Sequence, residues 1–143
     1  MRELFRLPNV QAARTAASYQ LLSKEALHFM GVDHIQRSLE QKQFEIVFKS
    51  GDPDRFPHLK AYLQGDKVWW IVVGTTMYPQ TPLLGKEVAS QVLRHARTED
   101  AKVFYAPLMF INTKSQNISL PSKNGRFTVL FDGFIPVKCR PHP

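Results

Sequence analysis

Residues 58–73, with the sequence HLKAYLQGDKVWWIVV, decide the fold of this chain. Two extended runs flank Gly65-Asp66, and the second run, residues 68–73, is apolar throughout. Gly at the first central position is what a two-residue type II′ turn prefers. We therefore expect an antiparallel hairpin. Its second strand should lie in the centre of a sheet, covered by helix on at least one side, because both of its faces are apolar.

The turn also predicts the register of this hairpin, since partners directly opposite each other share a face. The expected apolar face pairs Leu63 with Val68, Ala61 with Trp70 and Leu59 with Val72. The opposite face is expected to pair Tyr62 with Trp69, Lys60 with Ile71 and His58 with Val73.

Helical periodicity appears on both sides of the hairpin. Residues 10–30 follow the N-cap residue Asn9 and carry an Ala- and Leu-rich stripe, which predicts an amphipathic helix. Gly31 is expected to end that helix, and Asp33 to cap a second helical piece. Residues 86–97 regain the helical period and predict another helix.

Three further segments are extended. Residues 44–49 alternate, so Phe44, Ile46 and Phe48 should share one face. Residues 103–111 predict an edge or bulged strand, because Pro107 cannot donate to a ladder. Asp132-Gly133 predicts a hairpin turn between strands at 127–131 and 134–137.

The order of these elements predicts an α+β fold. We expect a single mixed, mainly antiparallel sheet of about five strands, with an N-terminal helix and a second helix packed on it. A chain of 143 residues with no internal repeat or long linker is expected to form one domain over residues 1–143, with a flexible tail over residues 138–143.

Composition narrows the compartment and the class of protein. The chain is 43% hydrophobic, which is a globular composition and excludes wholesale disorder. Cys139 is the one cysteine, so an intrachain disulfide and a cysteine-based zinc cluster are excluded. No apolar run reaches the roughly 18–20 residues that span a bilayer, and the N-terminus lacks a signal peptide's apolar segment. We expect a cytoplasmic protein without a membrane partner.

Positive charge concentrates in the last third of the chain. The chain carries 19 basic and 12 acidic residues, a formal net charge of +7. Residues 102–143 hold six of the basic residues and one acidic residue, a net of +5. Such a surface can contact a nucleic acid or an acidic protein. The candidate anion-binding or nucleic-acid-binding residues are Lys114, Lys123, Arg126, Lys138 and Arg140.

Aromatic residues suggest a different kind of surface. Tyr and Trp are common at the centres of protein interfaces. Tyr62, Trp69 and His58 fall on the second face of the expected hairpin, and Tyr78 and Tyr105 are expected to be exposed. These five are the candidate protein-binding residues. Packing of Trp69 and Tyr62 beneath a helix is the alternative for that face, because the strand is expected to be central.

The element order supports two resemblances. Helix, three antiparallel strands, helix, strand across residues 10–111 resembles the restriction-endonuclease-like core of the PD-(D/E)xK family. The segment 65–74, GDKVWWIVVG, resembles a strand of the NTF2-like cone, which is the alternative. The first resemblance implies an Asp at the start of the second strand and an acid-x-Lys on the third, which together hold a divalent metal.

That pattern is degenerate in this chain. Asp54 lies near the required place, but residues 69–73 hold no acid and no Lys. Asp66-Lys67 falls in the preceding turn, and the acid-x-Lys matches at residues 40–42 and 100–102 lie elsewhere. If the core is endonuclease-like, its family's active site is absent, and a binding-only descendant follows.

Other chemistries lack a signature. A His58–His95 acid–base pair with Lys60 can be imagined, but neither it nor a metal spacing among the histidines is supported by a motif. We expect no catalytic residue, metal or cofactor. The expected function is non-enzymatic binding of a protein partner, as an accessory or toxin-neutralising immunity-type protein. The alternatives are nucleic-acid binding through the basic C-terminal third and a divergent nuclease. The sequence leaves the oligomeric state open.

Overall fold

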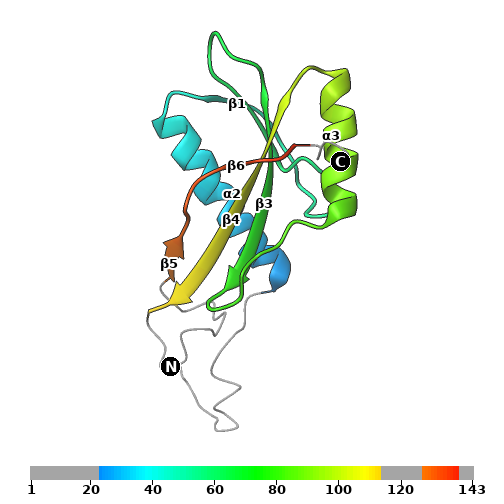
Figure 1. Cartoon of the computed structure of the whole chain (residues 1–143). Helices are drawn as coiled ribbons and strands as arrows, with labels where there is room; N and C mark the ends of the chain where they lie inside the picture. Colours follow the sequence, from blue (N-terminus) through cyan, green and yellow to red (C-terminus); the bar gives the residue numbers. More distant parts are fainter. Residues whose placement is uncertain (1–22, 114–126, 139–143) are drawn as a thin grey trace, which may run out of the picture.

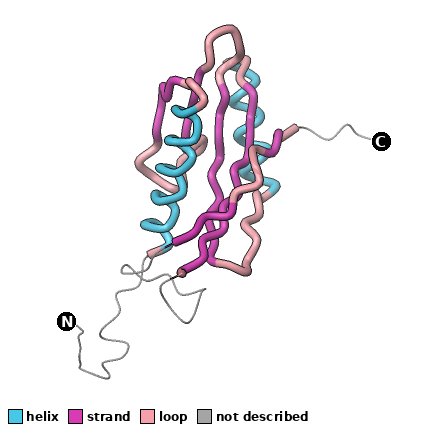
Figure 2. The backbone as a smooth tube through the Cα atoms, turned by 90° about the vertical axis from the view of Figure 1, so that its left-hand side faces the viewer, coloured by secondary structure: helices cyan, strands magenta, loops and turns pink. Residues whose placement is uncertain are grey.

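A computed structural model describes residues 23–113 and 127–138 as one sheet between two helices (Figures 1 and 2). The helices are α2 (Lys24–Gln41) and α3 (Lys86–Thr98). The strands are β1 (Glu45–Lys49), β2 (Leu59–Tyr62), β3 (Trp69–Met77), β4 (Lys102–Asn112), β5 (Phe127–Leu130) and β6 (Ile135–Pro136). No helix in these described ranges is both long and apolar enough to cross a membrane.

The sheet is mixed, and its order is β1-β2-β3-β4-β5, with β6 also paired to β4. β1, β2 and β3 pair antiparallel, whereas β3 and β4 run parallel over Trp69–Met77 and Lys102–Phe110. The parallel pair needs a crossover, which α3 supplies. The predicted α+β class is confirmed, with six strands in place of about five.

Each face of the sheet builds its own core. The face toward α2 buries a large cluster: Leu27, Val32, Ile35, Leu39, Phe44, Leu59, Ala61, Ile71, Val73, Ala106, Leu108 and Phe110. The face toward α3 buries a smaller one: Trp70, Val72, Val92, Ala96, Val103 and Tyr105. β3 contributes to both clusters, so the prediction of a central strand apolar on both faces is confirmed.

The first described helix is continuous through Gly31, so the expected break there is wrong. Ser23 caps α2, and its Oγ accepts a hydrogen bond from the Ala26 amide at 2.9 Å. Gly31 is buried against β3, where an added Cβ would lie 2.3 Å from Cγ2 of Thr75. The glycine therefore serves close packing of helix on sheet and not helix termination. The rest of the predicted N-terminal helix, residues 10–22, lies outside the described residues.

The β2–β3 register differs from the prediction by one residue. Leu59 lies opposite Ile71, Lys60 opposite Trp70 and Ala61 opposite Trp69. The cause is a longer turn: the Asp66 amide donates to the Leu63 carbonyl at 3.0 Å, and Gly65, with φ +91°, takes the third position of that turn. A shift of one residue exchanges the faces of a strand, so Trp69 joins Leu59 and Ala61 toward α2.

A bulge in β1 corrects the expected faces of that strand. Ile46 lies opposite Ala61, but Phe48 lies opposite Lys60, so one extra residue, Val47, stands between the two pairs. Ile46 packs on the α2-side core with Phe44. The extra residue turns Phe48 to the other face, together with Val47. Phe48 therefore does not share a face with Phe44 and Ile46.

The C-terminal strands also depart from expectation. β4 has neighbours on both sides and is not an edge strand. Asp132-Gly133 does not close a hairpin, because β5 and β6 both run antiparallel to β4, over Met109–Asn112 and Phe104–Tyr105. Pro107 falls between these two pairings, where no ladder bond from its nitrogen is needed. This gap explains how a proline can occupy a strand with neighbours on both sides.

Replacing Gly31 with Ala tests the close packing of α2 on β3. The new methyl group would meet Thr75 Cγ2, so we expect the free energy of unfolding to fall by about 1–3 kcal/mol. Thr75→Ser removes that methyl group, and the double variant should recover the loss, because Ala is a better helix former than Gly by about 1 kcal/mol. Urea denaturation of the two single variants and the double variant measures this. Equal losses with and without the Thr75 change would contradict it.

Candidate functional site

Among residues 23–113 and 127–138, no helix covers the outer face of β1 and β2, which lies on the α3 side of the sheet. The buried cluster beneath α3 draws its strand residues from β3 and β4 and none from β1 or β2. Five side chains of β1 and β2 lie on this face. Four of them form what we call the outer patch, namely Val47, Phe48, Lys60 and Tyr62, and Glu45 lies at its border opposite Tyr62. Val47 is 51% exposed and Phe48 43% exposed. Two neighbouring apolar side chains on an edge strand therefore face solvent.

Lys60 organises the centre of the outer patch. Its Nζ lies 5.3 Å from the ring centroid of Phe48 and 4.4 Å from that of Trp70. Cation–π attraction to two rings holds the ammonium between them. Glu99, after the end of α3, approaches the same ammonium at 3.9 Å. The centre of the patch is thus an ammonium held between two aromatic rings, with a carboxylate at its border.

A hollow of about 280 Å³ opens at the C-terminal end of β1. It is lined by Phe48, Lys49, Ser50, Gly51, Asp52 and Arg55. The Ser50 hydroxyl donates to the Asp52 carbonyl at 2.9 Å and shapes the loop. Lys49 already pairs with Asp33 of α2 at 2.6 Å, whereas the Arg55 guanidinium has no ion-pair partner within the described part of the chain. The outer patch therefore continues into a hollow that carries an available cation.

The structure does not bring the five predicted aromatic and histidine candidates onto one surface. Tyr62 lies in the outer patch, opposite Glu45. Trp69 lies on the α2 side, with its ring 4.8 Å from Phe44 and 4.0 Å from Phe104. The expectation that Tyr62 and Trp69 share a face is wrong, because the register is shifted by one residue.

The remaining three candidates, His58, Tyr78 and Tyr105, lie neither in the outer patch with Tyr62 nor beside Trp69. His58 and Tyr105 are buried, at 3% and 7% exposure. Tyr105 packs beneath α3 against Gly74, and its burial raises the pKa of its hydroxyl to about 12. The expected exposure of Tyr105 is therefore wrong. Tyr78 is exposed but lies past the end of β3, where its amide donates to the Phe110 carbonyl.

His58 directly precedes β2, at the point beyond which β3 has no β2 residue beside it and pairs only with β4. Its Nδ1 accepts a hydrogen bond from the Val73 amide at 2.9 Å, and its Nε2 donates to the Pro53 carbonyl at 2.8 Å. Both ring nitrogens are committed in the neutral form. Burial lowers the pKa of His58, although the Pro53 carbonyl and Asp54 act in the opposite direction. This ring completes the sheet, and a surface acid–base pair with His95, which is exposed on α3, is not formed.

His28 of α2 packs against this ring, a pairing that the sequence does not suggest. The two ring centroids lie 4.3 Å apart. His28 is 8% exposed, and its Nε2 has no hydrogen-bond partner in the described part of the chain. Burial, with a smaller effect from His58, lowers the pKa of His28 to about 4. The two rings are therefore neutral at neutral pH and meet edge to face, with an interplanar angle of 69°.

The acid-x-Lys match at residues 100–102 forms ion pairs with Asp66 and Lys67 at the opposite end of β2. Asp66 accepts from Lys102 Nζ at 3.0 Å, and Lys67 pairs with Asp100 at 3.0 Å. Hydrogen bonds from Lys102, the Lys67 amide and Trp69 Nε1 hold the pKa of the Asp66 carboxyl below its usual range. These contacts tie the β2–β3 turn to the start of β4. Within residues 23–113 and 127–138, no three His, Cys, Asp or Glu side chains gather as metal ligands.

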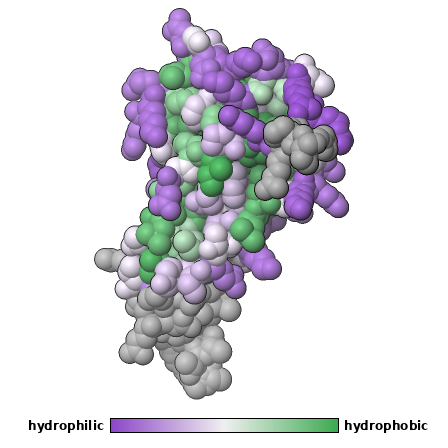
Figure 3. All heavy atoms as spheres, in the orientation of Figure 1, coloured by the Kyte–Doolittle hydropathy of each residue, from purple (hydrophilic) through white to green (hydrophobic). Residues whose placement is uncertain are grey.

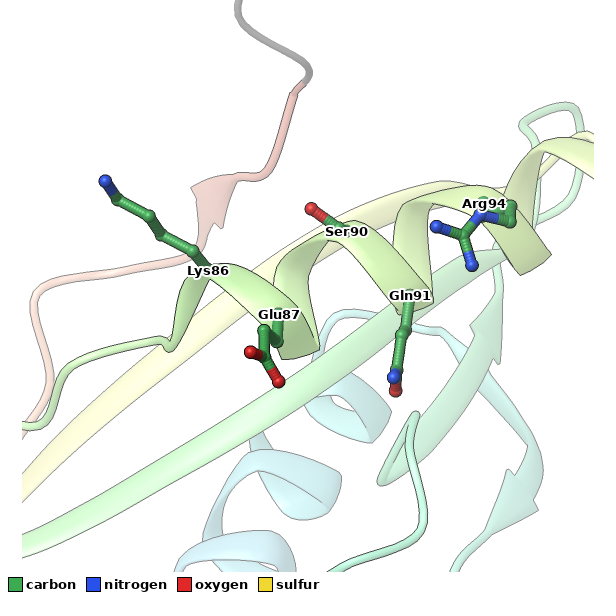
Figure 4. Close-up of a pocket in the computed structure, with 5 residues that line it drawn as sticks. All are labelled: Lys86, Glu87, Ser90, Gln91 and Arg94. Carbon is green, nitrogen blue, oxygen red and sulfur yellow. The ribbon is translucent and has the colours of Figure 1, made fainter.

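Most of the predicted basic surface lies outside the described residues, namely Lys114, Lys123, Arg126 and Arg140. Lys138 is described and exposed, and it follows Val137, which packs on the cluster beneath α3. A second hollow of about 280 Å³ lies on the outer side of α3, lined by Lys86, Glu87, Ser90, Gln91 and Arg94 (Figure 4). Lys86 and Ser90 project from one flank of the helix and Glu87 and Gln91 from the other.

One feature of the sequence indicates the outer patch, but it is overlooked when the strand is read as strictly alternating. Ile46, Val47 and Phe48 form an apolar run of three in a strand that otherwise alternates. Such a run indicates either an apolar residue on the solvent face or a bulge. In the structure Val47 lies in a bulge and is also exposed to solvent. The His28–His58 contact has no comparable signal, because it joins residues 30 positions apart through tertiary packing.

Comparison with known proteins gives one family. The family model described as a domain of unknown function (DUF8840) matches residues 25–137. No curated protein and no solved structure matches the chain.

The buried histidines predict a pH dependence of stability. The unfolded chain binds protons on His28 and His58 near pH 6.5, whereas the folded chain resists doing so, in His28 down to about pH 4. The unfolded state therefore holds more protons in this window, and stability falls as the pH drops from about 6.5 toward 4. We expect His28→Phe to flatten this fall, measured by urea denaturation at pH 7.5, 6, 5 and 4.5. Parallel curves for the two proteins would refute the assignment.

Proposed function

The chain belongs to the DUF8840 family, and from the geometry of its outer patch we propose that it is a non-enzymatic domain that binds another protein. The observation that carries this proposal is the exposure of Val47 at 51% and Phe48 at 43%, side by side on an edge strand. Large apolar side chains grouped on a surface favour protein contact, because their burial releases water.

The composition of the outer patch fits a protein interface. Two apolar residues stand with Tyr62 around the fixed ammonium of Lys60, and charged residues lie at the border. Interface centres combine aromatic and apolar anchors with a polar rim. β1 adds a sheet edge, along which another chain can lie.

The element order supports a binding role for a core of endonuclease type. The order of helix, three antiparallel strands, helix and strand is present in the described residues. His58, directly before β2, is neutral and uses both ring nitrogens in hydrogen bonds. The acid and the lysine that the endonuclease pattern requires on the third strand are missing from β3, although Asp54 is present. We therefore propose a binding-only descendant of the endonuclease-like core, acting in the cytoplasm as an accessory or immunity-type protein.

Site-specific photo-cross-linking tests the outer patch. A photo-reactive residue placed at position 47 of the full chain in its native cells should form a covalent product with a protein. Adding Phe48→Glu should reduce that product by at least about tenfold, because truncated or charged anchors lose 2 kcal/mol or more of binding. Phe48 is 43% exposed, so the variant should remain folded, and its melting temperature is measured beside the cross-linking yield.

Leu83 provides the matched control. It is 85% exposed, apolar and located in the connection between β3 and α3. A photo-reactive residue at position 83 should give no comparable product. Equal products at positions 47 and 83, or none at either, would show that the outer patch is not a protein-binding surface.

One observation favours a second candidate function, nucleic-acid binding. Lys86, Ser90 and Arg94 recur every fourth residue along α3, and neither cation is ion-paired within the described part of the chain. Residues four apart form a line along a helix. Hydrophilic side chains gather along the right-hand edge of Figure 3, where α3 lies in Figure 1. A line of cations and a hydroxyl suits a phosphate backbone.

A salt series on heparin and on DNA separates the two functions. If α3 contacts phosphates, the Lys86→Ala/Arg94→Ala variant should bind less tightly and show a salt dependence smaller by about two counterions. Lys24→Ala/Arg37→Ala on α2 removes the same charge from the opposite side of the sheet and serves as the control. Equal weakening by both variants would indicate a net-charge effect and exclude a site on α3.

A further inference from the structure

We propose that the protein bound by the outer patch is a second copy of this chain, joined through β1 in an antiparallel, two-fold arrangement. The inference rests on the protein-binding function proposed above. β1 is the end strand of the sheet, with β2 on one side and no strand on the other among the described residues. A two-fold contact uses the same surface on both copies, so the surface must complement itself.

The apolar part of the outer patch meets this condition. Glu45, Val47 and Phe48 lie on the outer face, whereas Ile46 and Lys49 point to the α2 side, where Lys49 pairs with Asp33. An antiparallel approach that keeps like faces together sets Phe48 of one copy against Val47 of the other, twice by symmetry. Both exposed side chains then become buried in one contact.

The charges are complementary under the same operation. In this register Glu45 of one copy lies opposite Ser50 of the other, and Ser50 lines the same hollow as Arg55. Neither Glu45 nor Arg55 has an ion-pair partner within the described ranges. The Glu45 carboxylate and the Arg55 guanidinium thus lie at opposite ends of the apolar centre. The two-fold operation brings Glu45 of each copy toward Arg55 of the other.

The bulge in β1 favours a closed pair over an open-ended assembly. Bulges interrupt the row of backbone groups that would template further strands. The contact therefore depends on side chains more than on an uninterrupted ladder. Each copy has one β1 edge, and the two-fold contact uses the β1 edge of both copies, so this contact closes at the dimer.

A charge-swap experiment on the full chain tests this pairing. Glu45→Arg alone and Arg55→Glu alone each place like charges together twice, so the dissociation constant of the dimer should rise at least about tenfold in each. An equimolar mixture of the two variants restores opposite charges at both contacts and should form a heterodimer near wild-type affinity. Analytical ultracentrifugation over a concentration series measures all three.

Glu87→Arg and Arg94→Glu on α3 are the matched controls, since they change the same charges on a helix that packs over β3 and β4 and should leave association unchanged. A chain that stays monomeric at every concentration, or a mixture that does not associate, overturns the inference. The cross-linking at position 47 then distinguishes the two failures. A product with a different protein would support protein binding by the outer patch and contradict the dimer. No product at all would contradict both proposals.

Discussion

The long parallel pairing of β3 with β4 is the constraint on which the rest of the structure depends. It runs from Trp69–Lys102 to Met77–Phe110 and cannot be closed by a tight turn. The chain must therefore cross over through α3, which covers the β3–β4 half of one face. Within the described part of the chain, α3 covers only that half of the face, so the outer patch on β1 and β2 is a consequence of the crossover.

The same arrangement explains the two buried histidines. β2 is short and ends while β3 continues, which leaves the Val73 amide without a strand partner on that side. His58 supplies the missing acceptor from its side chain, and α2 brings His28 against it. A strand end that could expose a polar site is instead closed by neutral rings. Burial of these two rings also makes the stability of the fold depend on pH.

Much of the fold could be predicted from local pattern. The central strand, the helix at residues 86–98 and the α+β class follow from periodicity and turn residues. The errors have specific causes. Gly65 has its positive φ at the third position of the turn and not at the second, which shifts the register by one residue. The bulge at Val47 places Phe48 on the face opposite to the predicted one. Gly31 allows close contact with Thr75 and does not end the helix. Of the candidate protein-binding residues, only Tyr62 lies in the outer patch.

The sequence by itself determined which segments are strands and helices, because hydrophobic periodicity and turn propensity are local properties of the chain. The tertiary structure alone decided which faces are covered. Whether Val47 and Phe48 reach solvent, and whether Trp69 lies beneath α2 or outside, depends on a one-residue register and on how far a helix extends across the sheet. These are relations between segments, so no single segment encodes them.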